Sequence, residues 1–311
     1  MSTITKSTAG ARRITRSRDS SWSAFLELTK PRISTMVLIT VVVAAVLGSP
    51  TWPGLLVVFN AAISIALIAA SGNAFNMYIE RYTDILMPRT ATRPLPDKRL
   101  TAGQVASFGA ICLGAGVAYM ATAVNLATTL CGIGTWILYV LIYTPLKTKT
   151  PYNTEVGAVA GAMPILMGGL ATSGTINPLI WIFFAVLFCW QFPHFMAIAW
   201  MYRDQYRDGG LKMLTVTEPT GAAAGKKAIA YAFANWAVSV LPVITFGTQW
   251  GFPVVGIVFA ILATVASVYY IKASIAFARD RNDATARRLL RVSISYLPAY
   301  MLMLVICSLI S

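Results

Sequence analysis

Charged side chains are scarce in this sequence. Of its 311 residues, 12% are charged and 57% are hydrophobic, and the mean hydropathy is +0.67. Soluble globular proteins carry about 25% charged residues, so this composition excludes a disordered chain and argues against a water-soluble enzyme. The chain is therefore divided into membrane spans rather than into soluble domains.

Cysteine and histidine are scarce as well. The four cysteines lie in apolar runs and form no CxxC pair, and His194 is the only histidine. Cysteines in this setting are typically small buried hydrophobic residues. The sequence thus predicts neither a disulfide framework nor a thiolate metal cluster.

Hydrophobic runs long enough to cross a bilayer occur nine times. A spanning helix needs about 20 residues at a rise of ~1.5 Å per residue. The alternating polarity of a β-barrel is absent, and lipid cannot satisfy free backbone groups, so we predict helices. The fold class is therefore all-α, a polytopic membrane bundle. The predicted spans are Ile33–Pro50, Leu55–Tyr78, Val105–Ala123, Ala127–Pro145, Val156–Thr172, Leu179–Tyr202, Ala228–Phe246, Phe252–Ile275 and Val292–Ile310.

One side of the predicted membrane carries no charge. All 25 Lys and Arg residues and all 11 acids fall on the other side, in five polar segments and the adjoining span ends. The positive-inside rule places this charged side, with the N-terminus, in the cytoplasm. Nine spans then put the C-terminus outside. The charged segments are residues 1–32, 79–104, 146–155, 203–227 and 276–291.

The net charge of +14 follows from this topology. Basic segments beside a membrane bind anionic lipid, so the lipid bilayer is the expected partner of these charges, and nucleic acid is not. Residues 1–25 hold five basic residues and one acid. They resemble a transit peptide, but a disordered basic cytoplasmic tail is the favoured interpretation. We expect a single domain over residues 26–311 in a bacterial inner membrane, with the mitochondrial inner membrane as the alternative.

Two pairs of acids mark the cytoplasmic ends of the second and sixth spans. Glu80 and Asp84 form the first pair, and Asp204 and Asp208 form the second. Each pair has i, i+4 spacing, which places both carboxylates on one helical face about 5–6 Å apart. The pairs are offset by the same 124 residues (204−80 and 208−84). This offset suggests a weak internal repeat whose halves meet at a central cavity open toward the cytoplasmic face.

The acids, with one amide, form a set of hard oxygen ligands. Mg²⁺ usually takes one or two carboxylates and shares its remaining sites with substrate phosphates. The alternative is a solvated helix end whose acids pair with Arg81, Arg203 and Arg207. Because acids at membrane depth are generally functional and both pairs occupy matching positions, we favour the metal site. The predicted Mg²⁺ ligands, direct or through water, are Asn76, Glu80, Asp84, Asp204 and Asp208.

Basic residues lie beside these acids. Arg89 and Arg93 belong to a proline-rich loop after the first pair, and Tyr143 and Lys147 end the fourth span. Guanidinium and ammonium groups bind phosphate, so acids and bases on one face predict a diphosphate–metal site. His194 has two possible interpretations. It could act as an iron ligand or a base, or it could be a hydrogen-bonded packing residue; its spacing alone favours packing.

Seven regions, spread from about residue 25 to the end of the chain, resemble one known family. They are Leu28–Arg32, Asn76–Pro94, Tyr143–Lys147, Gly157–Pro164, Trp190–Phe195, Tyr202–Tyr206 with Met213 and Leu214, and Ala286–Leu289. With nine spans and acidic motifs ending spans two and six, the chain resembles the UbiA superfamily of intramembrane prenyltransferases. Arg89–Pro94 and Trp190–Phe195 resemble its haem-modifying branch.

The resemblance implies an activity. It implies an enzyme that transfers farnesyl from farnesyl diphosphate to the 2-vinyl group of haem B, with Mg²⁺ as cofactor, release of diphosphate and haem O as product. Arg89, Arg93, Tyr143 and Lys147 would hold the diphosphate, and His194 would orient the porphyrin. A downstream haem A synthase or cytochrome oxidase assembly proteins are the partners that such an activity implies.

The chain departs from the family pattern at two positions. Glu80 stands where many members have aspartate, and Gln205 stands where many have a second aspartate, with Asp208 one turn later. Two other functions stay open: a superfamily relative acting on an aromatic quinone precursor, and a secondary transporter of an anionic solute. The carboxylates lie at only one face of the membrane, and this argues against a transporter.

Overall fold

Helices are the only regular secondary structure in residues 21–248 and 253–310, the part of the chain that the computed structural model describes. Nine helical stretches in this part are long and apolar enough to cross a membrane, which confirms the predicted fold class. The helices are α1 (Ser21–Leu28), α2 (Pro31–Gly48), α3 (Leu55–Ile85), α4 (Ala102–Ala123), α5 (Leu126–Ile137), the π-helix η1 (Leu138–Tyr143), α6 (Thr144–Leu146), α7 (Asn153–Ser173), α8 (Pro178–Met201), α9 (Arg203–Asp208), α10 (Leu214–Thr217), α11 (Ala222–Ser239), α12 (Pro242–Thr248), α13 (Pro253–Arg279) and α14 (Asp283–Ile310).

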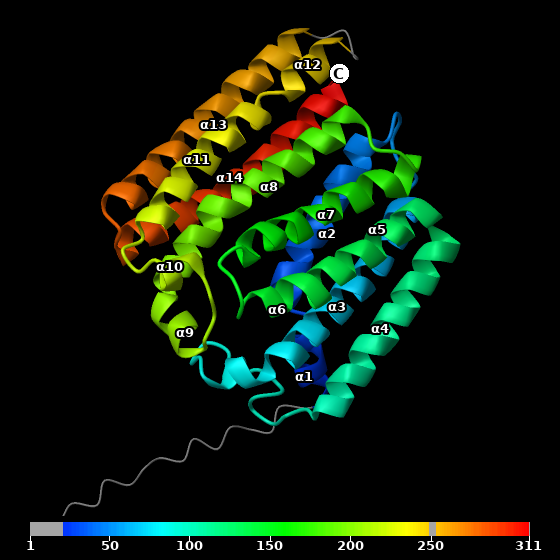
Figure 1. Ribbon diagram of the computed structural model, residues 1–311. Coiled ribbons are helices and arrows are strands. Elements are labelled where there is room, and N and C mark those ends of the chain that lie inside the picture. The colour runs from blue at the N-terminus through cyan, green and yellow to red at the C-terminus, as the bar shows by residue number, and fades with distance from the viewer. Residues whose placement is uncertain (1–20, 249–252, 311) are drawn as a thin grey trace, which may run out of the picture.

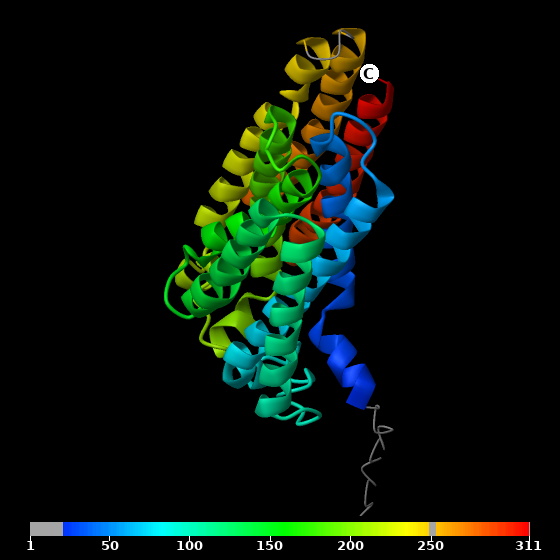
Figure 2. The same cartoon turned by 90° about the vertical axis from the view of Figure 1, so that its right-hand side faces the viewer.

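The long helices form two groups that meet along α7 and α8 (Figure 1). In one group α2, α3 and α5 pack on α7, while α4 packs on α3 and α5. In the other group α11 and α14 pack on α8, while α13 packs on α11 and α14. The short helices α1, α6, α9 and α10 lie together at one end of the bundle. Figure 2 shows the long helices running along a common direction, with α1 and the C-terminus at opposite ends.

Glycines allow α2 and α7 to approach closely. A Cβ atom at Gly168 would lie 2.5 Å from the carbonyl oxygen of Val41, and one at Gly48 would lie 2.8 Å from the Cα of Gly169. Without a hydrophobic drive between helices in lipid, such small-residue contacts are a main source of helix association. This contact fixes α7, which packs against η1 beside the candidate site.

Several helices extend beyond the hydrophobic runs that predicted them. The second predicted span ends at Tyr78, whereas α3 continues to Ile85, and α14 begins at Asp283 rather than near Val292. Hydropathy marks the part of a helix that lies in lipid, but charged residues such as Glu and Arg are good helix formers and carry the helix further. As a result, both acids of the first pair lie within α3.

The predicted tail is too long at its C-terminal end. Residues 1–20 lie outside the described part of the chain, but residues 21–25 belong to α1. Ala24 and Leu28, which are four residues apart and so share a helical face, are buried in one cluster with Ala74 and Met77 of α3. The Trp22 and Leu26 side chains are exposed.

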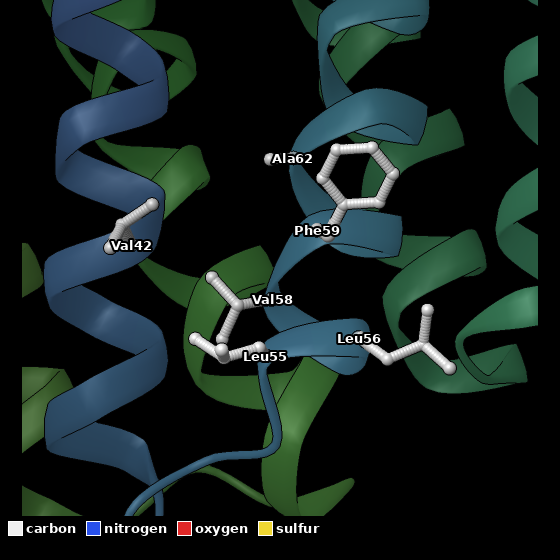
Figure 3. A pocket seen from close by; sticks show the side chains of 6 residues that line it. All are labelled: Val42, Leu55, Leu56, Val58, Phe59 and Ala62. Carbon is white, nitrogen blue, oxygen red and sulfur yellow. The ribbon is translucent and has the colours of Figure 1, made fainter.

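An apolar groove of about 530 Å³ lies between α2 and α3 (Figure 3). Its lining comes from Val42 of α2 and from Leu55, Leu56, Val58, Phe59 and Ala62 of α3. Phe59 is 21 residues from Glu80, which is about 32 Å along the axis of α3. The groove is therefore separate from the acidic motif, and its apolar lining suits a lipid-facing surface.

Candidate active site

The last turns of α3 carry the first acidic motif into the protein interior. Asn76 is 1% exposed and Asp84 is 0% exposed, and the Glu80 side chain is 11% exposed. Their i, i+4 spacing places all three on the inward face of α3, as the sequence predicts.

Each of the two buried carboxylates is engaged by a cation. The Lys147 ammonium lies 2.7 Å from Glu80, and one guanidinium nitrogen of Arg93 lies 2.6 Å from Asp84 and 3.6 Å from Glu80. A carboxylate removed from water needs such partners, because an unpaired buried charge is very costly. Burial acts to lower the pKa of Lys147, but the nearby Glu80 carboxylate outweighs it, and the pKa lies above its ordinary value.

The loop between α3 and α4 folds back over the end of α3. The Thr90 hydroxyl donates to the backbone oxygen of Asp84 at 2.9 Å, which holds the loop so that Arg93 reaches the carboxylates. Arg89 contacts α9 instead of the carboxylates: its guanidinium lies 4.8 Å from the centre of the Tyr202 ring, and its backbone N–H donates to Oε1 of Gln205. Arg89 therefore joins this loop to α9.

The fourth span changes from an α-helix to the π-helix η1 just before the site. π-helical turns are rare and occur frequently at functional sites. Here the Tyr139 and Tyr143 rings stack with their centres 5.7 Å apart, and the Lys147 ammonium lies 4.6 Å from the centre of the Tyr143 ring. Only a glycine fits opposite, because a Cβ atom at Gly157 would lie 2.6 Å from the Tyr143 ring.

A small basin of about 80 Å³ lies between these elements. It contains side chains from both halves of the chain, so the end of α3 and the segment that follows the sixth span face a common basin. The lining residues are Glu80, Asp84, Met87, Arg89, Thr90, Arg93, Tyr143, Lys147, Tyr206, Leu211 and Met213. All four predicted diphosphate-holding residues are among them. Burial raises the pKa of Tyr206, which keeps this hydroxyl protonated.

The second acidic pair does not reach the basin. The helix of the sixth span ends at Met201, Tyr202 leaves helical geometry (φ −110, ψ 16), and α9 begins in a new direction. The Asp204 side chain is 63% exposed and pairs with Arg207 at 2.7 Å, and Asp208 is exposed. α9 instead presents Tyr206 and Gln205 to the first motif. The predicted convergence of four carboxylates is thus not what the structure shows.

The donor set that remains still fits Mg²⁺. No group of three or more His, Cys, Asp or Glu residues in the described ranges could hold a metal. Mg²⁺, however, needs only one or two carboxylates when substrate phosphates complete its coordination. Glu80 and Asp84, on one face beside basic residues, meet that requirement.

Lys30 is a site residue that the sequence analysis missed. Its ammonium donates to Oδ1 of Asn76 at 2.8 Å, and Nδ2 of Asn76 donates to the Thr144 hydroxyl at 3.2 Å. Both ends of the amide thereby take part in linking the joint between α1 and α2 to α3 and α6. Burial, with help from the nearby Arg93 charge, lowers the pKa of Lys30 to about 7. A lysine at the start of a span is indistinguishable from an ordinary positive-inside charge, so only its place in a family-like stretch could have marked it.

His194 lies in the second group of helices and does not line the basin. Its Nδ1 is 2.8 Å from the Ser293 hydroxyl, and its ring stacks on Trp190 with the centres 4.8 Å apart. Within the described chain, Nε2 has no hydrogen-bond partner. The packing interpretation therefore accounts for one ring nitrogen, and the other is available.

The fold and the site identify the class of protein. The model of the UbiA prenyltransferase family matches residues 37–297, and the chain belongs to this family of membrane prenyltransferases. Among curated relatives, "Protoheme IX farnesyltransferase" of Rhodopirellula baltica is 41% identical over 280 residues, covering 90% of this chain and 98% of the relative. The protein of the same name from Solibacter usitatus is 35% identical over 283 residues, covering 88% and 94%.

Solved structures share the fold. A UbiA homologue from Archaeoglobus fulgidus bound to DMAPP and Mg²⁺ matches with a TM-score of 0.67 at 16% identity, covering 91% of this chain and 99% of that one. Digeranylgeranylglyceryl phosphate synthase matches with a TM-score of 0.72 at 16% identity, covering 94% and 100%. The family assignment favours the enzyme over the transporter interpretation.

Proposed function

We propose that this protein transfers the farnesyl group of farnesyl diphosphate to the 2-vinyl group of haem B to make haem O. The bond between farnesyl C1 and the diphosphate oxygen breaks, a carbon–carbon bond forms at the vinyl terminus, and water supplies the hydroxyl group. The observation that carries the proposal is the buried cluster of Glu80, Asp84, Lys147 and Arg93 at the basin. The relatives' names support haem as the acceptor.

The basic residues of the basin bind the leaving group in this proposal. Diphosphate leaves slowly until its charge is neutralised, and Arg93 and Lys147 supply two positive charges while Tyr143 and Tyr206 supply hydroxyl donors. Glu80 and Asp84 would hold Mg²⁺, which acts as a Lewis acid on the diphosphate. Asn76 positions these residues, since its amide already bonds Lys30 and Thr144. Asp204 and Asp208 are not part of the proposed set because they face away.

The acceptor needs no nucleophilic side chain, because the vinyl carbon itself attacks the farnesyl group. We assign the orientation of the porphyrin to His194, whose ring is fixed by Ser293 and Trp190 and whose Nε2 is available. The enclosing helices exclude water from the farnesyl cation. We place the protein in a bacterial inner membrane with a cytoplasmic N-terminus, and a haem A synthase or oxidase assembly protein would take up its product.

A comparison of acceptors tests the proposed function. Purified protein is incubated with farnesyl diphosphate and Mg²⁺, and with either haem B or an aromatic acid, and products are separated by chromatography and weighed by mass spectrometry. The proposal predicts a more hydrophobic haem whose mass has increased by one farnesyl and one hydroxyl group. A prenylated aromatic acid, with unchanged haem, would instead identify a quinone-pathway relative.

A further inference from the structure

The Lys30 ammonium lies beside the site and donates to Asn76. It joins α1 to α2 with φ 48 and ψ 62, the left-handed conformation that side chains other than glycine rarely adopt. It also precedes Pro31, a position that favours extended backbone. A conformation this unfavourable persists only where the surrounding structure imposes it, and such residues cluster at functional sites.

The left-handed turn directs the Lys30 side chain into the protein. α1 packs on α3 through Ala24 and Leu28, while Pro31 begins α2, so the joint is held from both sides. The ammonium reaches Asn76 at 2.8 Å, one helical turn before Glu80 on the same face of α3. The strained joint thus brings a positive charge to the end of the acid–base cluster.

The carboxylates of the cluster pair with Lys147 and Arg93 and not with Lys30. Lys147 contacts Glu80, and Arg93 contacts both Glu80 and Asp84. In the described part of the chain, no carboxylate lies within 4.0 Å of the Lys30 ammonium. Asn76 takes one of its three N–H donors. A partly buried ammonium with a neutral amide as its partner is a charge that an anion would stabilise.

We propose that Lys30 is a further diphosphate-binding residue, which joins Lys147 and Arg93 on the leaving group. This inference rests on the proposed function, because it assigns Lys30 to the same prenyl diphosphate. Its flexible four-carbon side chain turns from Asn76 toward a phosphate oxygen while its backbone stays fixed by the joint. α1 is then the element that holds Lys30 in place beside the site.

Charge and hydrogen bonding at Lys30 can be separated by substitution. Lys30→Gln keeps an N–H donor for Asn76 and removes the charge, and Lys30→Arg keeps the charge. Lys98→Gln is a matched control, because Lys98 is the other lysine in the described chain with a left-handed backbone (φ 57), but its side chain is exposed. Lys30→Gly removes the side chain and also relieves the left-handed backbone strain. This variant is therefore expected to fold, and it tests the loss of the side chain separately from misfolding.

The measurement is binding of inorganic pyrophosphate to the full chain in the presence of Mg²⁺ by titration calorimetry, together with the KM for farnesyl diphosphate. We expect Lys30→Gln and Lys30→Gly to weaken pyrophosphate binding about 10- to 100-fold, the effect of losing one charged hydrogen bond. KM should rise similarly, Lys30→Arg should recover most of the affinity, and Lys98→Gln should bind as the unsubstituted protein does.

Two results would overturn the inference. If Lys30→Gln binds pyrophosphate normally, Lys30 is only a structural partner of Asn76. If the unsubstituted protein binds no pyrophosphate, diphosphate is not a ligand of this site. Both results come from pyrophosphate binding, which needs no haem. Failure of the proposed function, seen as no haem product despite normal pyrophosphate binding, is therefore a distinct outcome.

Discussion

One guanidinium nitrogen of Arg93 contacts both carboxylate oxygens of Asp84, at 2.8 and 2.6 Å. The aspartate is fully buried and the arginine comes from a surface loop, so this contact closes the loop over the end of α3. Both residues serve the proposed chemistry, and they also stabilise each other. Their separate contributions can be measured.

The two acidic motifs should differ in their effect on activity. Asp84→Asn removes a buried ligand of the basin, so the rate of haem O formation should fall about 100-fold or more, the range expected when a metal ligand is lost. Asp204→Asn changes an exposed carboxylate paired with the exposed Arg207, so its rate should stay within about 3-fold of the unsubstituted rate. Equal losses in steady-state assays would show that α9 turns inward during the reaction.

Stability should depend on Arg93 far more than on Arg89. Arg93→Gln leaves the buried Asp84 carboxylate without its cation, which should cost about 3–5 kcal/mol and lower the Tm in detergent. Arg89→Gln changes an exposed side chain that stacks on Tyr202, and its Tm should change little. In the double variant Arg93→Gln with Asp84→Asn, most of the lost Tm should return. No recovery would mean that the pair does not interact as the structure shows.

The position of the Tyr143 ring should depend on the absence of a side chain at Gly157. Gly157→Ala places a methyl group 2.6 Å from the Tyr143 ring, so the ring must move and kcat/KM for farnesyl diphosphate should fall about 10-fold. Gly103→Ala is the control, since within residues 21–248 and 253–310 a Cβ at that position would have nothing within 4 Å apart from its chain neighbours and its own helix backbone. A fully active Gly157→Ala enzyme would exclude Tyr143 from the diphosphate-binding set.

His194 should matter for haem and not for the prenyl donor. His194→Ala should weaken haem B binding and shift its absorption spectrum while leaving pyrophosphate binding unchanged, since His194 does not line the basin. Ser293→Ala, which removes the partner of Nδ1, should have the same effect in weaker form. An unchanged haem spectrum in His194→Ala would support the packing interpretation.

The sequence was sufficient to predict the inward face of α3. Acids four residues apart share a helical face wherever the helix continues, and α3 does continue through Asp84. It was not sufficient for Asp204 and Asp208, because the break at Tyr202 depends on tertiary packing and leaves no proline or glycine signal. The same spacing on α9 therefore presents its acids outward, which spacing alone could not indicate.

Contacts between distant segments were also beyond the sequence. Lys30 and Asn76 are 46 residues apart, and Arg89 and Gln205 are 116 apart. Composition and hydropathy predict which residues face lipid but not which loops touch each other. The nine spans follow from the energetics of transferring each segment into lipid. The basin, by contrast, forms where the loop between α3 and α4 meets the segment after α8.

The decisive experiment is a structure of the protein with farnesyl thiodiphosphate and Mg²⁺. We expect the diphosphate between Arg93, Lys147 and Tyr206, with a metal ion about 2.1 Å from an oxygen of Glu80 or Asp84. A diphosphate and metal bound on the outer side of α9 at Asp204 and Asp208, with the α3 acids still paired to Arg93 and Lys147, would contradict it.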